Sequence, residues 1–555
     1  MSSLLLPWMT LSILIAVGGA ISLRLVQSPD KARNVAVLVT GGIFIVAMAA
    51  TIDFYQLSQA NVAEKWGIKI PGLVVLPLSL DRLTALILPF VALLVFLTVL
   101  ATPRTKLRRV PFSGLLVSEA ILFFLYGSRD PWVLITLLSL LSLQAVFELH
   151  NRRKPWRNMA GHMLAHVVLL VMGWSLICVS PDYAAGFLQV FEANSSAEPL
   201  SSIAGWGLSL LLLGLLIRVG IFPFHTWIGE LGEHASLATT LVFLLPMPSI
   251  YVLVRLVLPI APSVVWDISM LAALLTAVYA SGMSLVQTQP RRYFCYSFLS
   301  HSALVLAGLS TREPISLSGS LAVWLSAGVS LTGVGLSLRS LEARMGQLSL
   351  TRFHGLFEQV PILAVMFLVS GLAAVGFPGT IGFVAEELLI EGVIHARLLA
   401  GVLLALVAAL NSIAVLQVYF RLFGGTQHRT SVMLHAQGAE RWVTLILVLL
   451  VFGTGLFPQP FISSRFRAAD DLLQNESNVE SQVNFPNEHG FIEAITEVVK
   501  EQSETEFEAE SPAKKTVLLT EIKRACFVRA ALLESSFRPP AQSAYTRTCS
   551  RDEDH

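Results

Sequence analysis

Charged residues are scarce in this chain of 555 residues. They make up 14% of the composition, whereas hydrophobic residues make up 54%. A soluble domain usually carries about 25% charged residues, so this composition excludes an ordinary soluble protein and indicates an integral membrane protein. The formal net charge of +1 gives no support for binding to nucleic acid.

Cysteine motifs are lacking as well. The four cysteines lie far apart, without CxxC or Cys/His spacing; they are Cys178, Cys295, Cys526 and Cys549. This arrangement excludes an iron–sulfur cluster, a zinc site or a disulfide framework built from nearby cysteines. We therefore expect this chain to bind no metal and no cofactor, and any redox chemistry to belong to partner chains.

Apolar runs are what the chain has in abundance. Fourteen of them fill residues 4 to about 462, and about 20 apolar residues span a bilayer. The first run is followed by further runs and not by a cleavage site, which favours a retained helix over a signal peptide. We expect helices at 4–24, 34–51, 84–101, 111–127, 131–148, 159–180, 204–228, 238–260, 267–288, 294–311, 317–338, 361–390, 399–423 and 442–462.

The expected fold is therefore an all-α integral membrane protein with about fourteen transmembrane helices. Loops after odd-numbered helices are basic, so the positive-inside rule places them in the cytoplasm. From residue 466 the chain becomes polar, and we expect residues 466–555 to form a disordered or weakly helical tail.

The seventh run, LLIRVGIFPFHTW (Leu215 to Trp227), combines an ionisable residue with a helix break. Placing Arg218 at bilayer depth costs about 2.5–3.5 kcal/mol on insertion scales, so such a residue normally faces a partner or a wet cavity. Gly220 and Pro223 interrupt the helix just before His225, which frees backbone polar groups. The run predicts an ion pathway; the alternative is a kinked core helix whose arginine reaches the membrane interface.

The twelfth run contains a second interruption, at Pro378 and Gly379. The two interrupted helices are five helices apart, so the units that contain them have opposite orientations in the membrane. This is the sequence signature of inverted-repeat transporters, whose sites lie at the breaks. Glu386 and Glu387 follow the second break and point about 100° apart on a helix, so only one of them faces the interior.

Further ionisable residues lie within the apolar runs. His162 and His166 share one helix face, as a relay, a metal pair or an interfacial pair. His301 suits either a proton relay near neutral pH or a hydrogen bond to a helix carbonyl. The candidate ion path comprises Arg218, His225, His301 and Glu386, with Glu119, His162, His166 and Glu387 as additional candidates.

Four segments resemble a known family: FPFHTW at 222–227, RRYFCYSFLSHSALVLAGL at 291–309, GFPGTIGFVAEE at 376–387 and LDRLTALIL at 80–88. They are similar to the antiporter-like, proton-translocating membrane subunits of respiratory complex I, of the chain M (subunit 4) type, and to the related Mrp cation/proton antiporter subunits. The resemblance covers about residues 1–465. It implies two inverted five-helix units, at 111–260 and 267–423, with broken helices seven and twelve, three helices before them in 1–110 and one helix after them at 442–462.

The resemblance also implies charged positions that this chain lacks. The family's helix-five glutamate falls on Ser139, its helix-eight lysine near Met247, and a helix-eleven histidine near Ala327. Its helix-seven lysine falls on Arg218, and a guanidinium cannot release its proton as a desolvated lysine can. Half of the relay that the family implies is therefore absent or fixed in charge, and the chain is a divergent relative.

The function implied by the resemblance is that of a membrane-arm subunit of an NADH-quinone oxidoreductase-like complex. Such a subunit conducts protons, coupled to respiratory electron transport, in a bacterial-type inner membrane. Quinone, FMN and iron–sulfur clusters would then be bound by partner subunits. Two alternatives stay open: an Mrp-like cation/proton antiporter component, and a scaffold membrane subunit of an inorganic-carbon uptake complex.

Overall fold

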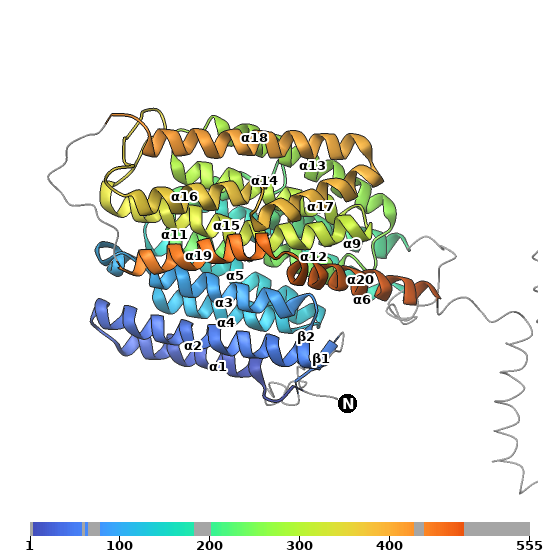
Figure 1. Ribbon diagram of the computed structural model, residues 1–555. Coiled ribbons are helices and arrows are strands. Elements are labelled where there is room, and N and C mark those ends of the chain that lie inside the picture. Colours follow the sequence, from blue (N-terminus) through green and yellow to red (C-terminus); the bar gives the residue numbers. More distant parts are fainter. Residues whose placement is uncertain (1–3, 58–60, 65–77, 182–200, 427–437, 482–555) are drawn as a thin grey trace, which may run out of the picture. The chain divides into compact units, whose positions relative to one another are not determined.

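The computed structural model describes residues 4–57, 61–64, 78–181, 201–426 and 438–481 (Figure 1). The helices lie side by side with roughly parallel axes in this view. The N-terminal elements are α1 (Trp8–Leu25), α2 (Pro29–Gln56), β1 (Asn61–Ala63), β2 (Ser79–Asp81), α3 (Thr84–Leu100), the 3-10 helix η1 (Arg104–Arg109), α4 (Phe112–Gly127), α5 (Pro131–Asn151) and α6 (Arg157–Val179). The remaining elements are α9 (Ser202–Val219), α10 (Thr226–His234), α11 (Leu237–Leu244), α12 (Pro248–Leu256), α13 (Ser263–Leu285), α14 (Pro290–Leu309), α15 (Pro314–Met345), α16 (Pro361–Ala374), α17 (Ile381–Ala396), α18 (Leu398–Phe423), α19 (Gly438–Leu456) and α20 (Gln459–Ser481).

The described residues are mostly helical, and ten helical spans among them are long and apolar enough to cross a membrane. The all-α expectation missed a short antiparallel ribbon, in which Val62 of β1 lies opposite Leu80 of β2. Proline begins several of the long helices, for example α5, α14 and α15. Proline suits a first helical position because the missing N–H has no partner within the helix there.

Helix α15 lies in the interior of the bundle. Every residue from Ser316 to Leu341 is buried, and the helix packs against α3, α14, α16, α17, α19 and α20. Several of its hydroxyls bond to carbonyls of their own helix: Ser320 donates to Ser316 O at 2.9 Å and Ser337 to Gly333 O at 2.8 Å. Helix α15 therefore fills the core and satisfies these polar groups locally.

The helix expected at 238–260 is not continuous, which corrects the sequence prediction. Helix α11 ends at Leu244 and α12 begins at Pro248, because Met247 adopts a left-handed conformation with φ 48° and ψ 52°. The freed carbonyl of Pro246 accepts hydrogen bonds from the Tyr126 hydroxyl at 2.6 Å and from the Trp324 indole N–H at 3.1 Å. This break therefore has fixed partners on α4 and α15.

The segment after the last expected helix also differs from the prediction. Residues 459–481 form α20, which packs against α15, so the polar segment expected from residue 466 begins as an ordered helix; its remainder lies outside the described residues. Arg465 of α20 is buried and donates to Arg82 O at 2.8 Å and to Leu83 O at 3.2 Å. Asp471 pairs with Arg82 at 2.7 Å. The charged side chains of Arg465 and Asp471 thus anchor α20 to the start of α3.

An ion-pair cluster around Asp81 fixes the same end of the bundle. Asp81 accepts a hydrogen bond at 2.9 Å from the N–H of Thr84, the first residue of α3, and it pairs with Arg129 at 3.2 Å and with Arg255. Burial alone would raise the pKa of Asp81, but the guanidinium groups of Arg255 and Arg129 outweigh burial and hold that pKa below its ordinary value. The cluster ties the ribbon, the start of α5 and the end of α12 together.

Candidate functional site

The second helix interruption separates α16 from α17 and brings Glu386 against the backbone. Gly376 has φ 68°, and Gly379 has φ 84°. A Cβ atom added to Gly376 would lie 2.6 Å from Glu386 Oε2, so the carboxylate packs directly on the glycine. Only a residue without a side chain permits both the left-handed conformation and this approach. The sequence motif at the break therefore positions Glu386 in the interior of the bundle, where it is 7% exposed.

His301 of α14 lies beside Glu386. The His301 Nε2 and Glu386 Oε1 atoms are 4.0 Å apart. His301 Nδ1 lies 2.7 Å from Ser297 O, and Nε2 lies 2.7 Å from Ala374 O at the end of α16. Both carbonyl oxygens only accept hydrogen bonds, so a doubly protonated imidazolium satisfies both contacts and a neutral ring satisfies one. The geometry suits an imidazolium with the Glu386 carboxylate as its counter-ion.

Asn411 of α18 is a polar neighbour of this site that sequence reasoning missed. Its Nδ2 donates to Ser300 Oγ at 2.9 Å, next to His301, and its buried Oδ1 has no partner among the described residues. A single asparagine within the long apolar run of α18 was the available signal. An unpaired buried oxygen beside a titratable pair is a place where a water molecule or a proton donor is stabilised.

The first interruption lies between α9 and α10. Helix α9 ends at Gly220, with φ 89°, and the Ile221 N–H donates to Leu216 O at 3.0 Å. The Trp227 indole N–H reaches back from α10 to Ile217 O at 3.0 Å. Phe222 N donates to Thr276 Oγ1 at 3.0 Å, and the peptide bond before Pro223 is cis. The interruption predicted at Gly220 and Pro223 is present, and neighbouring side chains satisfy its backbone.

His225 lies at the start of α10, apart from His301 and Glu386. Its Nε2 is 3.0 Å from the hydroxyl of Tyr279 on α13. The imidazole is also within ring contact of Phe222 and Tyr296, with centroids 5.8 and 6.3 Å away. An aromatic and hydroxyl environment therefore surrounds this histidine.

Arg218 is buried in α9, and no acidic side chain in the described part of the chain pairs with it. Its Nε donates to Ser142 Oγ at 3.1 Å, one terminal nitrogen lies 3.5 Å from Phe243 O, and the guanidinium carbon is 3.8 Å from the Phe243 ring centroid. Among the residues that the structure describes, Arg218 forms no ion pair. A cation–π contact and polar oxygens thus replace a carboxylate.

Two of the three positions where the family pattern predicts an ionisable residue that this chain lacks have local roles here. Ser139 of α5 is half-buried and donates to Ile135 O of its own helix at 2.7 Å. Ser142, one turn further along α5, faces Arg218 instead, and the sequence reasoning missed it. Met247 sits in the break between α11 and α12. The prolines on either side of Met247 were the signal for that break.

The additional candidates lie in separate places. Glu119 of α4 is fully buried, and neither carboxylate oxygen has a partner within the described ranges. His166 of α6 is buried with Nδ1 2.8 Å from Gly214 O, whereas His162 is half-buried with Nδ1 2.9 Å from Asn158 O. Glu387 is exposed on α17. The structure brings His301 together with Glu386, and within the described ranges no hydrogen bond or ion pair joins the other candidates to one another.

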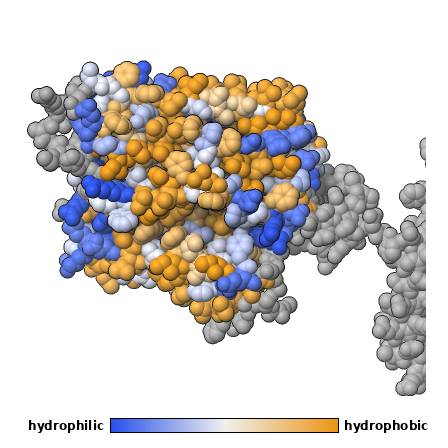
Figure 2. All heavy atoms as spheres, in the orientation of Figure 1, coloured by the Kyte–Doolittle hydropathy of each residue, from blue (hydrophilic) through white to orange (hydrophobic). Residues whose placement is uncertain are grey.

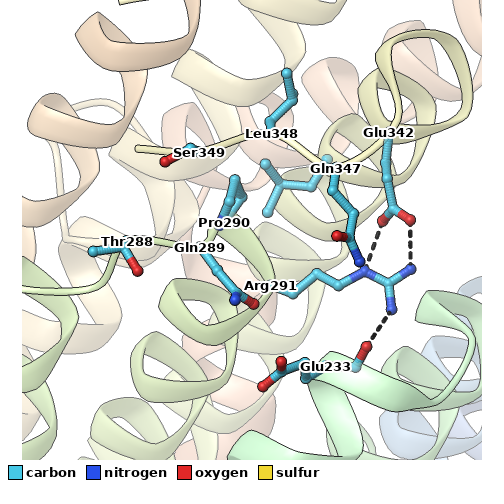
Figure 3. A pocket seen from close by; sticks show the side chains of 10 residues that line it. Glu233, Thr288, Gln289, Pro290, Arg291, Glu342, Gln347, Leu348 and Ser349 are labelled. Carbon is cyan, nitrogen blue, oxygen red and sulfur yellow. Dashed lines mark hydrogen bonds and ion pairs between the residues drawn. The ribbon is translucent and has the colours of Figure 1, made fainter. Parts of the chain in front are cut away.

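A cavity of about 320 Å³ lies where α10, α13, α14 and α15 end or begin (Figure 3). Arg291 spans it: its Nε and one terminal nitrogen bind Glu342 at 2.6 and 2.8 Å, and its other terminal nitrogen donates to the carbonyls of Gly232, Glu233 and Ala235. Arg291 thus caps α10 and joins it to α15, at the start of the helix that carries His301. The cavity contains none of the predicted ion-path residues.

Comparison with known proteins matches the transmembrane family described as "NADH:quinone oxidoreductase/Mrp antiporter, TM" over residues 151–412. A relative, subunit M of NADH-quinone oxidoreductase from Rickettsia conorii, is 25% identical over 272 residues, which are 47% of this chain and 55% of that protein. The chain thus spans about half the length of this curated relative.

Two solved structures share the fold. A chain of respiratory complex I from Thermus thermophilus with bound NADH superposes with a TM-score of 0.72 at 23% identity, covering 84% of this chain and 99% of that chain. A chain of the Mrp complex from Dietzia superposes with a TM-score of 0.70 at 16% identity, covering 86% and 100%. These findings confirm the resemblance: the chain is similar to antiporter-like membrane subunits of bacterial complexes and shares their fold, and its apolar helices suit a multi-pass protein of the inner membrane.

Proposed function

We propose that this antiporter-like subunit, related to chain M of NADH-quinone oxidoreductase and to Mrp antiporter subunits, conducts protons in the membrane arm of an NADH-quinone oxidoreductase-like complex. The observation that carries the proposal is the pair of His301 and Glu386, 4.0 Å apart at an interrupted helix. A titratable pair inside the apolar bundle marks an ion pathway better than any surface feature does.

The proposed architecture has fourteen membrane spans. In it, α9–α10, α11–α12 and α16–α17 each form one interrupted span, and the inverted units comprise 111–260 and 267–423, after three helices in 1–110 and before a last span at 442–462. Positive-φ glycines at both Gly220 and Gly376 support the correspondence between the first and second units. In this arrangement the two breaks are equivalent positions of one repeated design.

The two proposed halves differ in their chemistry. In the second half, a proton arriving at Glu386 neutralises the carboxylate and weakens its hold on the His301 imidazolium, which then releases its own proton. In the first half, Arg218 stays charged, because a guanidinium does not deprotonate in proteins. We propose that proton transfer passes through Glu386 and His301, and that Arg218 supplies a fixed positive field near the break that carries His225.

The remaining candidates have smaller parts in this proposal. Glu119 holds a proton in isolation, because an unpaired buried carboxylate is costly to ionise. His162 and His166 brace α6, which their carbonyl partners support. Electron transfer, with its quinone, FMN and iron–sulfur clusters, belongs to other subunits of the assembly.

The test of this proposal is Glu386→Gln in the full chain, assembled with its partners and reconstituted in liposomes with a pH-sensitive dye. The amide keeps the size of the side chain but cannot take up a proton. We expect the rate of proton movement to fall at least about tenfold, as for the loss of an essential proton-transfer group. Glu313→Gln, at an exposed helix start, is the control; a mutant rate equal to the control rate would remove Glu386 from the path.

The same liposome assay distinguishes two alternative functions from proton conduction in an NADH-quinone oxidoreductase-like complex. The Mrp-like alternative predicts that proton movement requires a counter-gradient of Na⁺ or K⁺. The scaffold alternative, for an inorganic-carbon uptake complex, is favoured because no carboxylate of the described residues pairs with Arg218. It predicts that wild-type and Glu386→Gln proteins show the same background proton leak while both assemble with their partners.

A further inference from the structure

One face of α17 carries ionisable side chains that point away from the bundle. Glu387, Glu391 and His395 are exposed, and they are spaced four residues apart, which places them in one stripe along the helix. None of the three has a hydrogen-bond or ion-pair partner among the residues that the structure describes. Figure 2 shows hydrophilic side chains among hydrophobic ones on the face where α16, α17 and α19 lie in front.

The stripe extends into the depth of the membrane. Glu387 directly follows Glu386, and it lies nine positions before the end of α17 at Ala396, or about 13 Å along the helix axis at 1.5 Å per residue. Half of a hydrocarbon core about 30 Å thick is about 15 Å. In the proposed architecture, with the end of α17 at the membrane surface, the carboxylate of Glu387 lies near the middle of the bilayer, where lipid tails offer it no hydrogen bond.

We propose that this stripe is the docking surface for a membrane-spanning helix of a partner subunit that carries Lys or Arg side chains about one turn apart. Opposite charges desolvated across a helix interface satisfy each other and fix the register of the two helices. Lipid headgroups do not reach this depth. The proposal names the partner surface within the proposed assembly, and it does not depend on whether the chain conducts protons.

A second copy of this chain fits the stripe poorly. In the described helical spans long and apolar enough to cross a membrane, exposed Lys and Arg residues lie only in the first or last turn, as Arg24, Lys31 and Arg441 do. No described span of this chain therefore presents a basic group at the depth of Glu387. The complementary helix belongs to a different chain.

The test places a photo-reactive benzophenone amino acid at Ile394, which is 38% exposed and lies on the same face. The full-length protein is irradiated in native membranes, and the adduct is identified by peptide mass spectrometry. We expect an adduct with an apolar segment of another chain that contains Lys or Arg. In the double variant Glu387→Gln/Glu391→Gln the yield should fall about tenfold, as for the loss of desolvated ion pairs.

Glu313→Gln serves as the matched control, since it removes one exposed carboxylate at a helix start and should leave the adduct yield unchanged. An adduct with lipid alone, an adduct with a second copy of this chain, or an unchanged yield in the double variant would each overturn the proposal. Should the double variant fold poorly, the identity of the wild-type adduct still decides. The cross-linking experiment does not depend on proton movement. A failure of the proposed interface can therefore be distinguished from a failure of the proposed proton conduction.

Discussion

At the scale of single residues, the chain keeps charge where the fold can satisfy it. Glu386 has an imidazole neighbour, whereas Arg218 has a serine hydroxyl and an aromatic face. Arginine tolerates such a setting because its planar guanidinium stacks on rings and is more weakly hydrated than an ammonium. The same position filled by lysine would need an anion or water. The residue type at 218 therefore matters for stability.

Arg218→Lys tests this point. Lysine keeps the positive charge but loses the Nε contact to Ser142 and the stacking on Phe243. We expect the protein in detergent micelles to lose roughly 1–3 kcal/mol of stability, measured by thermal unfolding, as for a buried hydrogen-bonded charge. Arg352→Lys, at an exposed position, should change nothing. A drop in proton movement with unchanged unfolding would contradict the role of Arg218 as a stabilising fixed charge, because lysine keeps that charge.

Asp81 gives the protein a pH-dependent contribution with a definite sign. Its pKa in the folded protein is lowered, so ionised Asp81 stabilises the fold above the ordinary aspartate pKa of about 3.9, and the contribution is lost as the pH falls through the lowered value. Asp81→Asn should cost about 1–3 kcal/mol at pH 7. Unfolding curves from pH 7 to 3 should show the difference shrinking in acid, and Asp30→Asn, at an exposed position, should show no such trend.

At the scale of elements, the interrupted helices are built on glycine geometry and distant caps. Gly376 and Gly379 share one break and both have positive φ, but they differ in their surroundings. Gly376 touches Glu386, whereas a Cβ atom at Gly379 would meet nothing within 4 Å. Substitutions at these two glycines therefore distinguish two effects: both strain the backbone, but only the one at Gly376 displaces the Glu386 carboxylate.

Gly376→Ala and Gly379→Ala should both destabilise the protein, by about 1–2 kcal/mol each, because a left-handed conformation disfavours a side chain. Only Gly376→Ala should also slow proton movement in liposomes, since its methyl group pushes Glu386 away from the break. Equal transport rates in the two variants, at equal amounts of folded protein, would show that the position of Glu386 against the glycine is unimportant.

The sequence predicted the elements that local chemistry determines. Gly220, Pro223 and the Gly-Phe-Pro-Gly segment predicted two interruptions, because glycine and proline close together within one apolar run combine left-handed backbone freedom with a missing N–H donor. The interruption at Met247 was missed because a length criterion merges two short apolar helices into one span. The choice between Glu386 and Glu387 also needed the structure, since helical geometry separates the two residues but does not say which one faces inward.

At the scale of the whole molecule, long-range contacts decided what the sequence left open. The Ser142 partner of Arg218 lies 76 positions away, and the Asn411 partner of Ser300 lies 111 positions away. No periodicity within one helix reveals which face of another helix meets it. Composition alone also assigned most of α20 to a polar tail. The backbone carbonyls that accept hydrogen bonds from its buried Arg465 belong to a segment far away in the sequence, so composition could not reveal them.

Arg465→Met measures how much α20 contributes to the bundle. The change leaves the carbonyls of Arg82 and Leu83 without their donor, and each buried unpaired group costs about 1–3 kcal/mol. We expect a clear fall in the thermal unfolding midpoint and faster proteolysis after α19. Arg467→Met, two positions along on the exposed side of α20, is the matched control, and equal midpoints for the two variants would contradict the anchoring role.

The bond between Arg465 and Leu83 spans 382 positions, and this separation has a consequence for biosynthesis. A chain made from its N-terminus inserts α3 long before α20 exists. Throughout that interval, water or the insertion machinery must satisfy the carbonyls of Arg82 and Leu83. Docking of α20 is therefore among the last steps of assembly, and a chain that stops before it leaves the start of α3 open to quality-control proteases.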